Sequence, residues 1–278
     1  MANIQHAQTQ QVLDRLVSQP THALLIVGPK GSGKLSTATW LATKWLECTE
    51  RTLTPDIFRA IQPDNKQITI EQIRELQSFA KVKQRDGIHR VIVIEQAETM
   101  AEPAQNALLK LLEEPSPGVA LILLATHDTA LRPTIRSRSQ IVRLLPLSKE
   151  QLSESYPQLA PIELEKLYRL SGGYLESFEA LRTDTNDHLA TAKQYLSSGK
   201  FERVAQSEQY GKDRDAAKEL VANVLLICRG ALSQTLSQNN PTYKLWLERS
   251  TACLTAHDRL VGNANIKLTL DSLALRLI

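Results

Sequence analysis

The sequence contains few cysteines and no long apolar run. Its 278 residues include only three cysteines, Cys48, Cys228 and Cys253, and their wide spacing excludes both a disulfide framework and a zinc cluster. No apolar run approaches the length of a membrane span, and the N-terminus lacks the pattern of a signal peptide. We therefore expect a cytoplasmic protein with no membrane association and no zinc.

The excess of positive over negative charge is also small. The formal net charge is +3, so the chain does not coat nucleic acid by charge alone, and any contact with DNA would come from a local patch. The basic run Lys81, Lys83, Arg85 and Arg90 could form such a patch or could be a solvated surface loop. The length allows two or three domains.

The N-terminal part is organised around a glycine-rich turn. The apolar residues 24–27 predict a buried strand before it, and the residues after it continue in a helical pattern. In such a turn the backbone N–H groups and the helix N-terminus bind phosphate, and a lysine reaches the β- and γ-phosphates. The residues predicted to bind phosphate are Gly28, Pro29, Lys30, Gly31, Ser32, Gly33, Lys34, Leu35 and Ser36.

The magnesium site of this turn is incomplete. The motif requires Ser or Thr directly after the lysine, because that hydroxyl is a ligand of Mg²⁺. Here Leu35 stands at that position, and Ser36 comes one residue late. We therefore expect a loop that holds phosphate but has a damaged metal site.

Polar residues follow two further predicted strands. Residues 90–94 predict a buried strand that ends at Glu95, where a carboxylate would orient Mg²⁺ and its waters. The next residue is Gln96, whose neutral amide cannot accept the proton of an attacking water. Residues 120–125 predict a strand that leads to Thr126, which could hydrogen-bond a phosphate or simply cap the strand.

Strands and helices alternate through the first half of the chain. This alternation implies an α/β fold, with a parallel sheet covered by helices on both faces. Thr69 and Gln72 predict a capping box at the start of a helix, whereas residues 46–64 are expected to be irregular. From about residue 188 onward the pattern is helical throughout. The predicted strands are 24–27, 90–94, 120–125 and 141–144.

Five segments together resemble a known family. They are GPKGSGK (28–34), ITIEQIREL (68–76), VIVIEQAETM (91–100), NALLKLLEEP (106–115) and TIRSRS (134–139). Their succession resembles the delta-prime subunits of bacterial DNA polymerase III clamp loaders, within the AAA+ class. The resemblance implies an AAA+ P-loop domain over residues 1–146, a small helical lid over 147–187, and an all-helical collar domain over 188–278 that joins subunits in a ring.

The same resemblance implies an arginine finger. In clamp loaders a Ser-Arg-Cys motif presents its arginine to the ATP site of the neighbouring subunit, and this motif corresponds here to Ser137, Arg138 and Ser139. Such a guanidinium stabilises the charge on a transferring phosphoryl group. The alternative is that Arg136 and Arg138 form a local salt bridge.

Other features of the family are absent. The four-cysteine zinc module of many members is missing. ATPase members also carry a nucleotide-sensing arginine in a Gly-Ser-Leu-Arg pattern, and Glu176 stands at the corresponding position, where it would repel phosphate.

Three hypotheses follow. The first is a clamp-loader subunit that does not hydrolyse ATP, since Leu35, Gln96 and Glu176 each replace a residue needed for turnover. Its implied partners are the clamp-loader ATPase (gamma/tau), the delta subunit, the sliding clamp and, through the complex, primed DNA. ATP or ADP could bind weakly, without Mg-dependent turnover. The second hypothesis is a self-sufficient AAA+ ATPase, and the third is a nucleotide-binding module outside replication.

Overall fold

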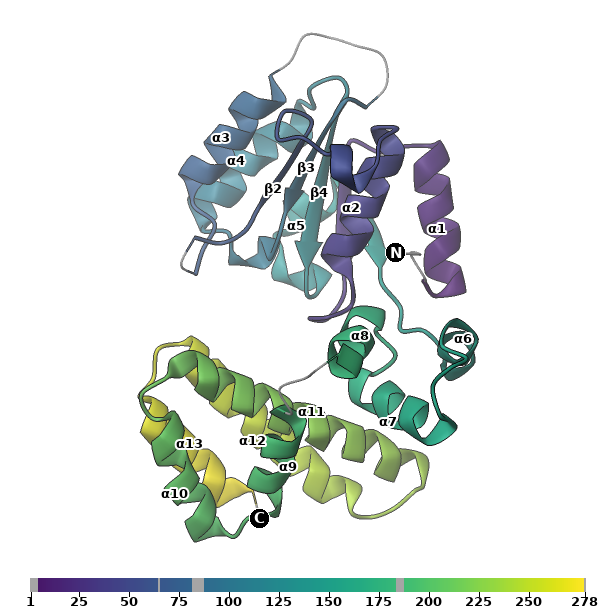
Figure 1. Ribbon diagram of the computed structural model, residues 1–278. Coiled ribbons are helices and arrows are strands. Elements are labelled where there is room, and N and C mark those ends of the chain that lie inside the picture. The colour runs from purple at the N-terminus through teal and green to yellow at the C-terminus, as the bar shows by residue number, and fades with distance from the viewer. Residues whose placement is uncertain (1–4, 65, 82–87, 184–187, 278) are drawn as a thin grey trace. The chain divides into compact units, whose positions relative to one another are not determined.

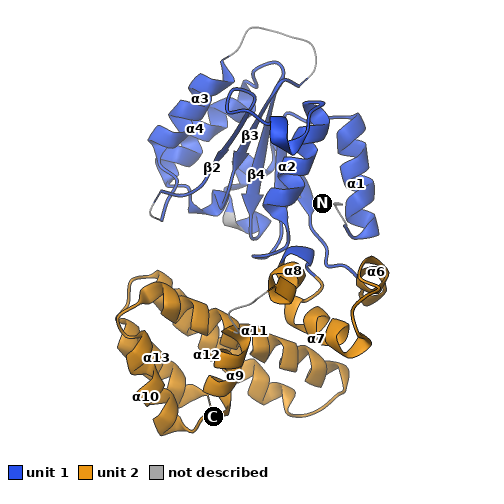
Figure 2. Cartoon of the chain, in the orientation of Figure 1, with its two compact units in different colours: residues 1–148, 174–176 blue, residues 149–173, 177–278 orange. Residues whose placement is uncertain are grey.

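The computed structural model describes residues 5–64, 66–81, 88–183 and 188–277, which form two compact units (Figure 1, Figure 2). The first unit comprises residues 1–148 and 174–176, and the second comprises residues 149–173 and 177–278. The predicted domain limits at residues 146 and 187 stay predictions, and residue 187 lies outside the described residues. Lys83 and Arg85 of the basic run also lie outside them.

A parallel five-stranded sheet in the order β2-β3-β4-β1-β5 forms the centre of the first unit. The side chains of β1 alternate between two cores, because successive residues of a strand point to opposite faces. Leu25 packs into one core, whereas Leu24 and Ile26 pack into the other. The strands are β1 (Ala23–Val27), β2 (Phe58–Ile61), β3 (Arg90–Ile94), β4 (Val119–Ala125) and β5 (Gln140–Arg143).

The edge strand β2 corrects one prediction. Residues 46–64 were expected to be irregular, but Phe58–Ile61 pairs with β3 in register from Phe58 against Val91 to Ile61 against Ile94. The strand is short, and all its side chains are at least partly exposed. An edge strand of this kind has no continuous apolar run, so the pattern that marks buried parallel strands does not detect it.

Helices cover both faces of the sheet, as predicted. Helices α1 and α2 pack with Leu24 and Ile26 on one face, whereas α3, α4 and α5 contribute to the core on the other face. The helices are α1 (Ala7–Ser18), α2 (Lys34–Trp45), α3 (Ile70–Ala80), α4 (Glu102–Glu113) and α5 (Pro133–Arg136), with short 3₁₀ turns η1 (Glu50–Thr52), η2 (Ala97–Thr99) and η3 (Asp128–Ala130).

The start of α3 follows its sequence signature. The backbone N–H of Thr69 donates to Gln72 Oε1 at 3.0 Å, and the backbone N–H of Gln72 donates to Thr69 Oγ1 at 3.4 Å. These reciprocal bonds satisfy N–H groups that have no partner within the helix. The predicted capping box is therefore confirmed.

The second unit is helical. Cys228 and Cys253 are fully buried in its core, where their side chains contribute to packing. Helix α7 ends at Ser171 and is capped by Gly172, whose φ of 62° places it in the left-handed region that favours glycine at a helix end. The helices are α6 (Lys149–Ser155), α7 (Pro161–Ser171), α8 (Leu175–Thr183), α9 (His188–Ser197), α10 (Lys200–Tyr210), α11 (Arg214–Ser237), α12 (Tyr243–Val261) and α13 (Ile266–Arg276). The first two residues of α8, Leu175 and Glu176, belong to the first unit.

Helix α11 differs from the expectation that no apolar segment approaches a membrane span. Among the described residues, this one helix is long and apolar enough for a span by length and composition, with a mean hydropathy of 1.3 over 18 residues. Length and composition are a weak indication, since the core helix of a soluble protein meets the same criteria. In this chain Val221, Val224 and Cys228 of α11 are buried in the helical core of the second unit.

Candidate functional site

The predicted phosphate-binding loop joins β1 to α2. Gly31 and Gly33 have φ values of 75° and 84°, which a residue with a side chain adopts only with strain. Gly28 is required for a different reason, because a Cβ atom at this position would lie 2.5 Å from Ser32 Oγ. The Ser32 side chain is buried, and its hydroxyl has no partner among the described residues. The conformation of the loop therefore depends on glycine at these three positions.

Lys34 bonds to the loop itself. Its Nζ donates to the carbonyl oxygen of Gly28 at 2.7 Å and to that of Pro29 at 2.8 Å. Burial lowers the pKa of the Lys34 ammonium, whereas the carboxylates of Glu98 and Glu176 act in the opposite direction. The lysine that the motif assigns to the β- and γ-phosphates is thus engaged with two backbone carbonyls.

The first turn of α2 shows what replaces the magnesium ligand. The Leu35 side chain is 38% exposed, and Ser36 is exposed beside it. Thr37, the next hydroxyl, is fully buried and donates to the carbonyl oxygen of Gly33 at 2.7 Å. The position that would supply a hydroxyl to Mg²⁺ therefore carries an apolar side chain.

Glu95 and Thr126 follow neighbouring strands of the sheet. Glu95 comes directly after β3, and burial together with the negative charge of Glu176 raises the pKa of its carboxyl group. Thr126 comes directly after β4, and its hydroxyl donates to Glu98 Oε1 at 2.8 Å. Both residues lie at the carboxyl edge of the sheet, where open α/β sheets bind their ligands. Their binding of nucleotide stays a prediction.

Glu98 is a site residue that sequence reasoning did not select. The 3₁₀ turn η2 carries its carboxylate to the end of β4, where Oε1 also accepts a bond from the backbone N–H of Thr126 at 3.2 Å. Its Oε2 is buried without a partner among the described residues. In the sequence, only its position three residues after Glu95 could have indicated Glu98. The turn shows that its carboxylate faces Thr126, and its charge acts on the pKa of Lys34.

Glu176 reaches the phosphate-binding loop directly. The backbone N–H of Gly33 donates to Glu176 Oε2 at 2.9 Å, and residues 174–176 belong to the same compact unit as the loop (Figure 2). The family resemblance implies that this residue stands at the position of a nucleotide-sensing arginine. The structure adds that its carboxylate is itself hydrogen-bonded to the loop.

Arg138, the predicted finger, lies between α5 and β5. Its guanidinium donates to the carbonyl oxygen of Thr134 at 3.1 Å and forms an ion pair with Glu113 Oε1 at 3.0 Å. The side chains of Arg138 and Glu113 are 39% and 50% exposed. The local salt bridge is therefore present at Arg138, but the residue remains accessible from outside. The Nε atom of Arg136 is buried and has no partner among the described residues.

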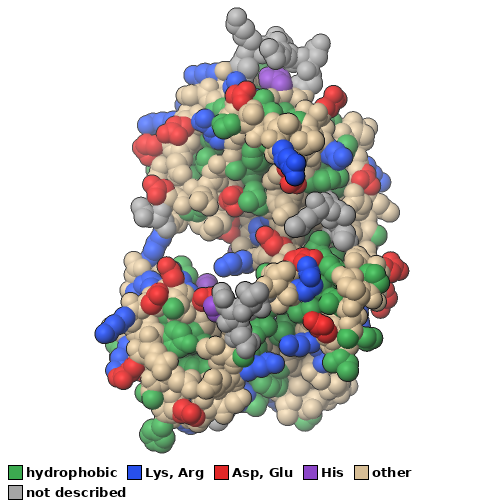
Figure 3. Space-filling view, viewed as in Figure 1, with side chains coloured by type: hydrophobic (Ala, Val, Ile, Leu, Met, Phe, Trp, Pro, Cys, Tyr) green, Lys and Arg blue, Asp and Glu red, His purple; other side chains and the backbone are tan. Residues whose placement is uncertain are grey.

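The described surface shows no concentration of one charge on the face seen in Figure 3, where basic and acidic side chains are interspersed. Among the described residues, no three His, Cys, Asp or Glu side chains form a group that could hold a metal ion.

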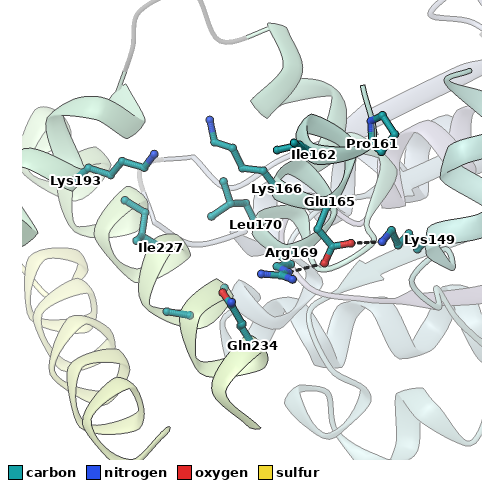
Figure 4. A pocket seen from close by; sticks show the side chains of 12 residues that line it. Lys149, Pro161, Ile162, Glu165, Lys166, Arg169, Leu170, Lys193, Ile227 and Gln234 are labelled. Atoms are coloured by element: carbon teal, nitrogen blue, oxygen red, sulfur yellow. Dashed lines mark hydrogen bonds and ion pairs between the residues drawn. The ribbon is translucent and has the colours of Figure 1, made fainter. Parts of the chain in front are cut away.

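A separate hollow of about 600 Å³ lies within the second unit, among α7, α9 and α11 (Figure 4). Glu165 forms ion pairs there with Lys149 and, at 2.6 Å, with Arg169. Leu170, Ile227 and Ala231 contribute apolar surface. None of the predicted site residues lines this hollow.

Comparisons with known proteins place the chain in a family. Residues 5–148 match the family model described as "DNA polymerase III, delta subunit". The DNA polymerase III subunit delta' of Pseudomonas aeruginosa is 35% identical over 179 residues, which cover 56% of this chain and 54% of that protein. The corresponding protein of Bacillus subtilis is 28% identical over 181 residues, which cover 59% of this chain and 55% of that protein. The matches thus span about half the length of these curated relatives.

A solved structure shows the same fold. The gamma subunit-related protein of Thermotoga maritima has a TM-score of 0.53 at 18% identity, and the match covers 97% of this chain and 98% of that one. The expected fold class, an AAA+ parallel sheet followed by helical regions, is confirmed. From its sequence matches, the chain is therefore a member of the family of DNA polymerase III delta' subunits.

Proposed function

We propose that this chain is a subunit of a bacterial clamp loader that does not hydrolyse ATP and that presents Arg138 to the ATP site of a neighbouring subunit. Family membership supports a role in DNA replication. Leu35 in place of a hydroxyl and Gln96 in place of a second acid support the absence of turnover. A self-sufficient ATPase would need both of these groups.

The observation that carries the proposal is the accessibility of Arg138. Its side chain is 39% exposed and is held by one backbone carbonyl and one exposed carboxylate. Both contacts can exchange with water, so the guanidinium can leave Glu113 for a more strongly charged partner such as a phosphate. Such a residue can act across an interface without unfolding its own unit.

The proposed partners are the gamma/tau ATPase, the delta subunit and the sliding clamp, with primed DNA reached through the complex. The proposed collar is the helical region from residue 188 onward, whose described part forms one core. The loop at residues 28–36, with Glu95 and Thr126 nearby, is proposed to bind ATP or ADP weakly and without Mg-dependent turnover. A subunit with this role would work in the cytoplasm or at the nucleoid.

The test is the primed-DNA-stimulated ATPase of a clamp loader reconstituted with its cognate ATPase and delta subunits. Arg138→Ala is compared with Arg132→Ala, a matched control whose side chain is 38% exposed and also pairs with a glutamate of α4, Glu102. Arginine fingers contribute about 10³–10⁵ to turnover at the site they complete. Arg138→Ala should therefore abolish the share of turnover from that site, whereas Arg132→Ala should leave it intact.

Assembly is followed on a sizing column in the same experiment. An assembled Arg138→Ala complex with an unchanged rate would remove the proposed mechanism. Failure of the wild-type chain to assemble would favour a nucleotide-binding module outside replication. The purified chain alone should show no ATP turnover, and turnover that disappears with Lys34→Ala would instead identify a self-sufficient ATPase.

A further inference from the structure

The phosphate-binding loop holds a carboxylate of its own chain. The N–H of Gly33 bonds to Glu176 Oε2 at 2.9 Å, although the two residues are 143 positions apart in the sequence. Gly33 directly precedes α2 and has a left-handed backbone conformation. Phosphate-binding loops use backbone N–H groups at this place to bind phosphate oxygens. Glu176 therefore occupies a donor that a bound nucleotide would need.

We propose that the Glu176 carboxylate takes the place of a nucleotide phosphate at Gly33. It thereby weakens the binding of ATP and ADP by this loop. This inference rests on the proposed weak binding of nucleotide by the loop and adds the residue that causes it. It does not involve Arg138 and can be tested without any partner subunit.

The ends of two helices favour a negative charge at this place. Gly33 is the N-cap of α2 and makes no side-chain capping bond, and Glu176 lies in the first turn of α8. The N-terminus of a helix carries a partial positive charge and unpaired N–H groups. The Glu176 carboxylate therefore accepts a hydrogen bond at the N-terminus of α2, where an external anion could otherwise bind.

The other charges of the site do not compensate for this carboxylate. Lys30 and Lys34 are the lysines of the loop, whereas Glu95, Glu98 and Glu176 contribute carboxylates that act on Lys34 or on one another. Lys34 is moreover bonded to two loop carbonyls. An entering triphosphate would thus meet three carboxylates and two lysines, and the Glu176 carboxylate is bonded to the loop backbone at Gly33.

The experiment measures ATP binding by the full-length chain with isothermal titration calorimetry, with and without Mg²⁺. The variants are Glu176→Gln, which keeps the size of the side chain without its charge, and Glu176→Ala, which removes the side chain beyond Cβ. Glu163→Gln is the matched control, since Glu163 is also an acidic residue in the first turn of a helix, α7. Circular dichroism and thermal unfolding verify that each variant is folded.

Both Glu176 variants should bind ATP at least about tenfold more tightly than the wild-type chain, because a unit negative charge has left a partly buried anion site. Glu163→Gln should bind like the wild type. Adding Lys34→Ala to Glu176→Gln should abolish the gain, since the new binding depends on the loop. Equal affinities of wild type and folded Glu176 variants would overturn the proposal, as would a gain that persists without Lys34.

Discussion

The ion pair of Arg138 and Glu113 allows a quantitative test of whether Arg138 holds its own unit together. The guanidinium and the carboxylate are 3.0 Å apart, but their side chains are 39% and 50% exposed. Water screens a pair with this exposure, so it stabilises the fold by about 0–1 kcal/mol. The hydrogen bond to the Thr134 carbonyl adds about 0.5–1.5 kcal/mol.

These values limit what substitutions can do to stability. Glu113→Gln should lower the free energy of unfolding by at most about 1 kcal/mol, and Arg138→Ala by at most about 2.5 kcal/mol. Urea unfolding of the two single variants and the double variant gives the coupling energy, which should stay below about 1 kcal/mol.

The two single variants should differ in the stimulated ATPase of the reconstituted complex. Arg138 has to leave Glu113 before it can reach a phosphate of a neighbouring subunit, so Glu113→Gln should keep or raise the stimulated ATPase, whereas Arg138→Ala should reduce it. If Arg138→Ala lowered the free energy of unfolding by more than about 3 kcal/mol, the loss would exceed what these two contacts supply. That result, or an equal loss of ATPase in Glu113→Gln, would show that the pair is structural and would refute the reasoning.

Three further changes have defined expected outcomes. Thr69→Ala removes the N-cap of α3 and should cost about 1 kcal/mol in urea unfolding, whereas a cost near zero would show that the capping box is not stabilising. Gly28→Ala places a Cβ 2.5 Å from Ser32 Oγ and should cost about 1–3 kcal/mol; addition of Ser32→Ala should recover part of this, and no recovery would exclude the clash as the cause. Burial and the charge of Glu176 raise the pKa of Glu95, so its carboxylate binds a proton more tightly in the folded than in the unfolded state. The resulting contribution to the free energy of unfolding is present below pH 4.5, the unfolded pKa, and is lost as the pH rises through the folded pKa. Thermal unfolding of Glu95→Gln against pH should lack this decline, and an unchanged profile would contradict the assignment.

The sequence by itself determined the features that depend on neighbouring residues. The central strands are continuous apolar runs because parallel strands are buried on both faces. The capping box of α3 and the left-handed end of α7 at Gly172 depend on residues within one helical turn. The glycine-rich turn between β1 and α2 is likewise a local pattern, and the resemblance of five short segments was enough to identify the family.

The tertiary structure alone decided which side chains meet in the site. Strand β2 exists because it pairs with β3, and its own residues carry little signal. Glu98 joins Thr126 because β3 and β4 are neighbours in the sheet, and Glu176 joins Gly33 across 143 positions. Periodicity and capping extend over a few residues, whereas these contacts depend on strand order and on the path of the whole chain. The sequence therefore predicted a phosphate-binding loop, and only the fold showed that a carboxylate of the same chain is bonded to it.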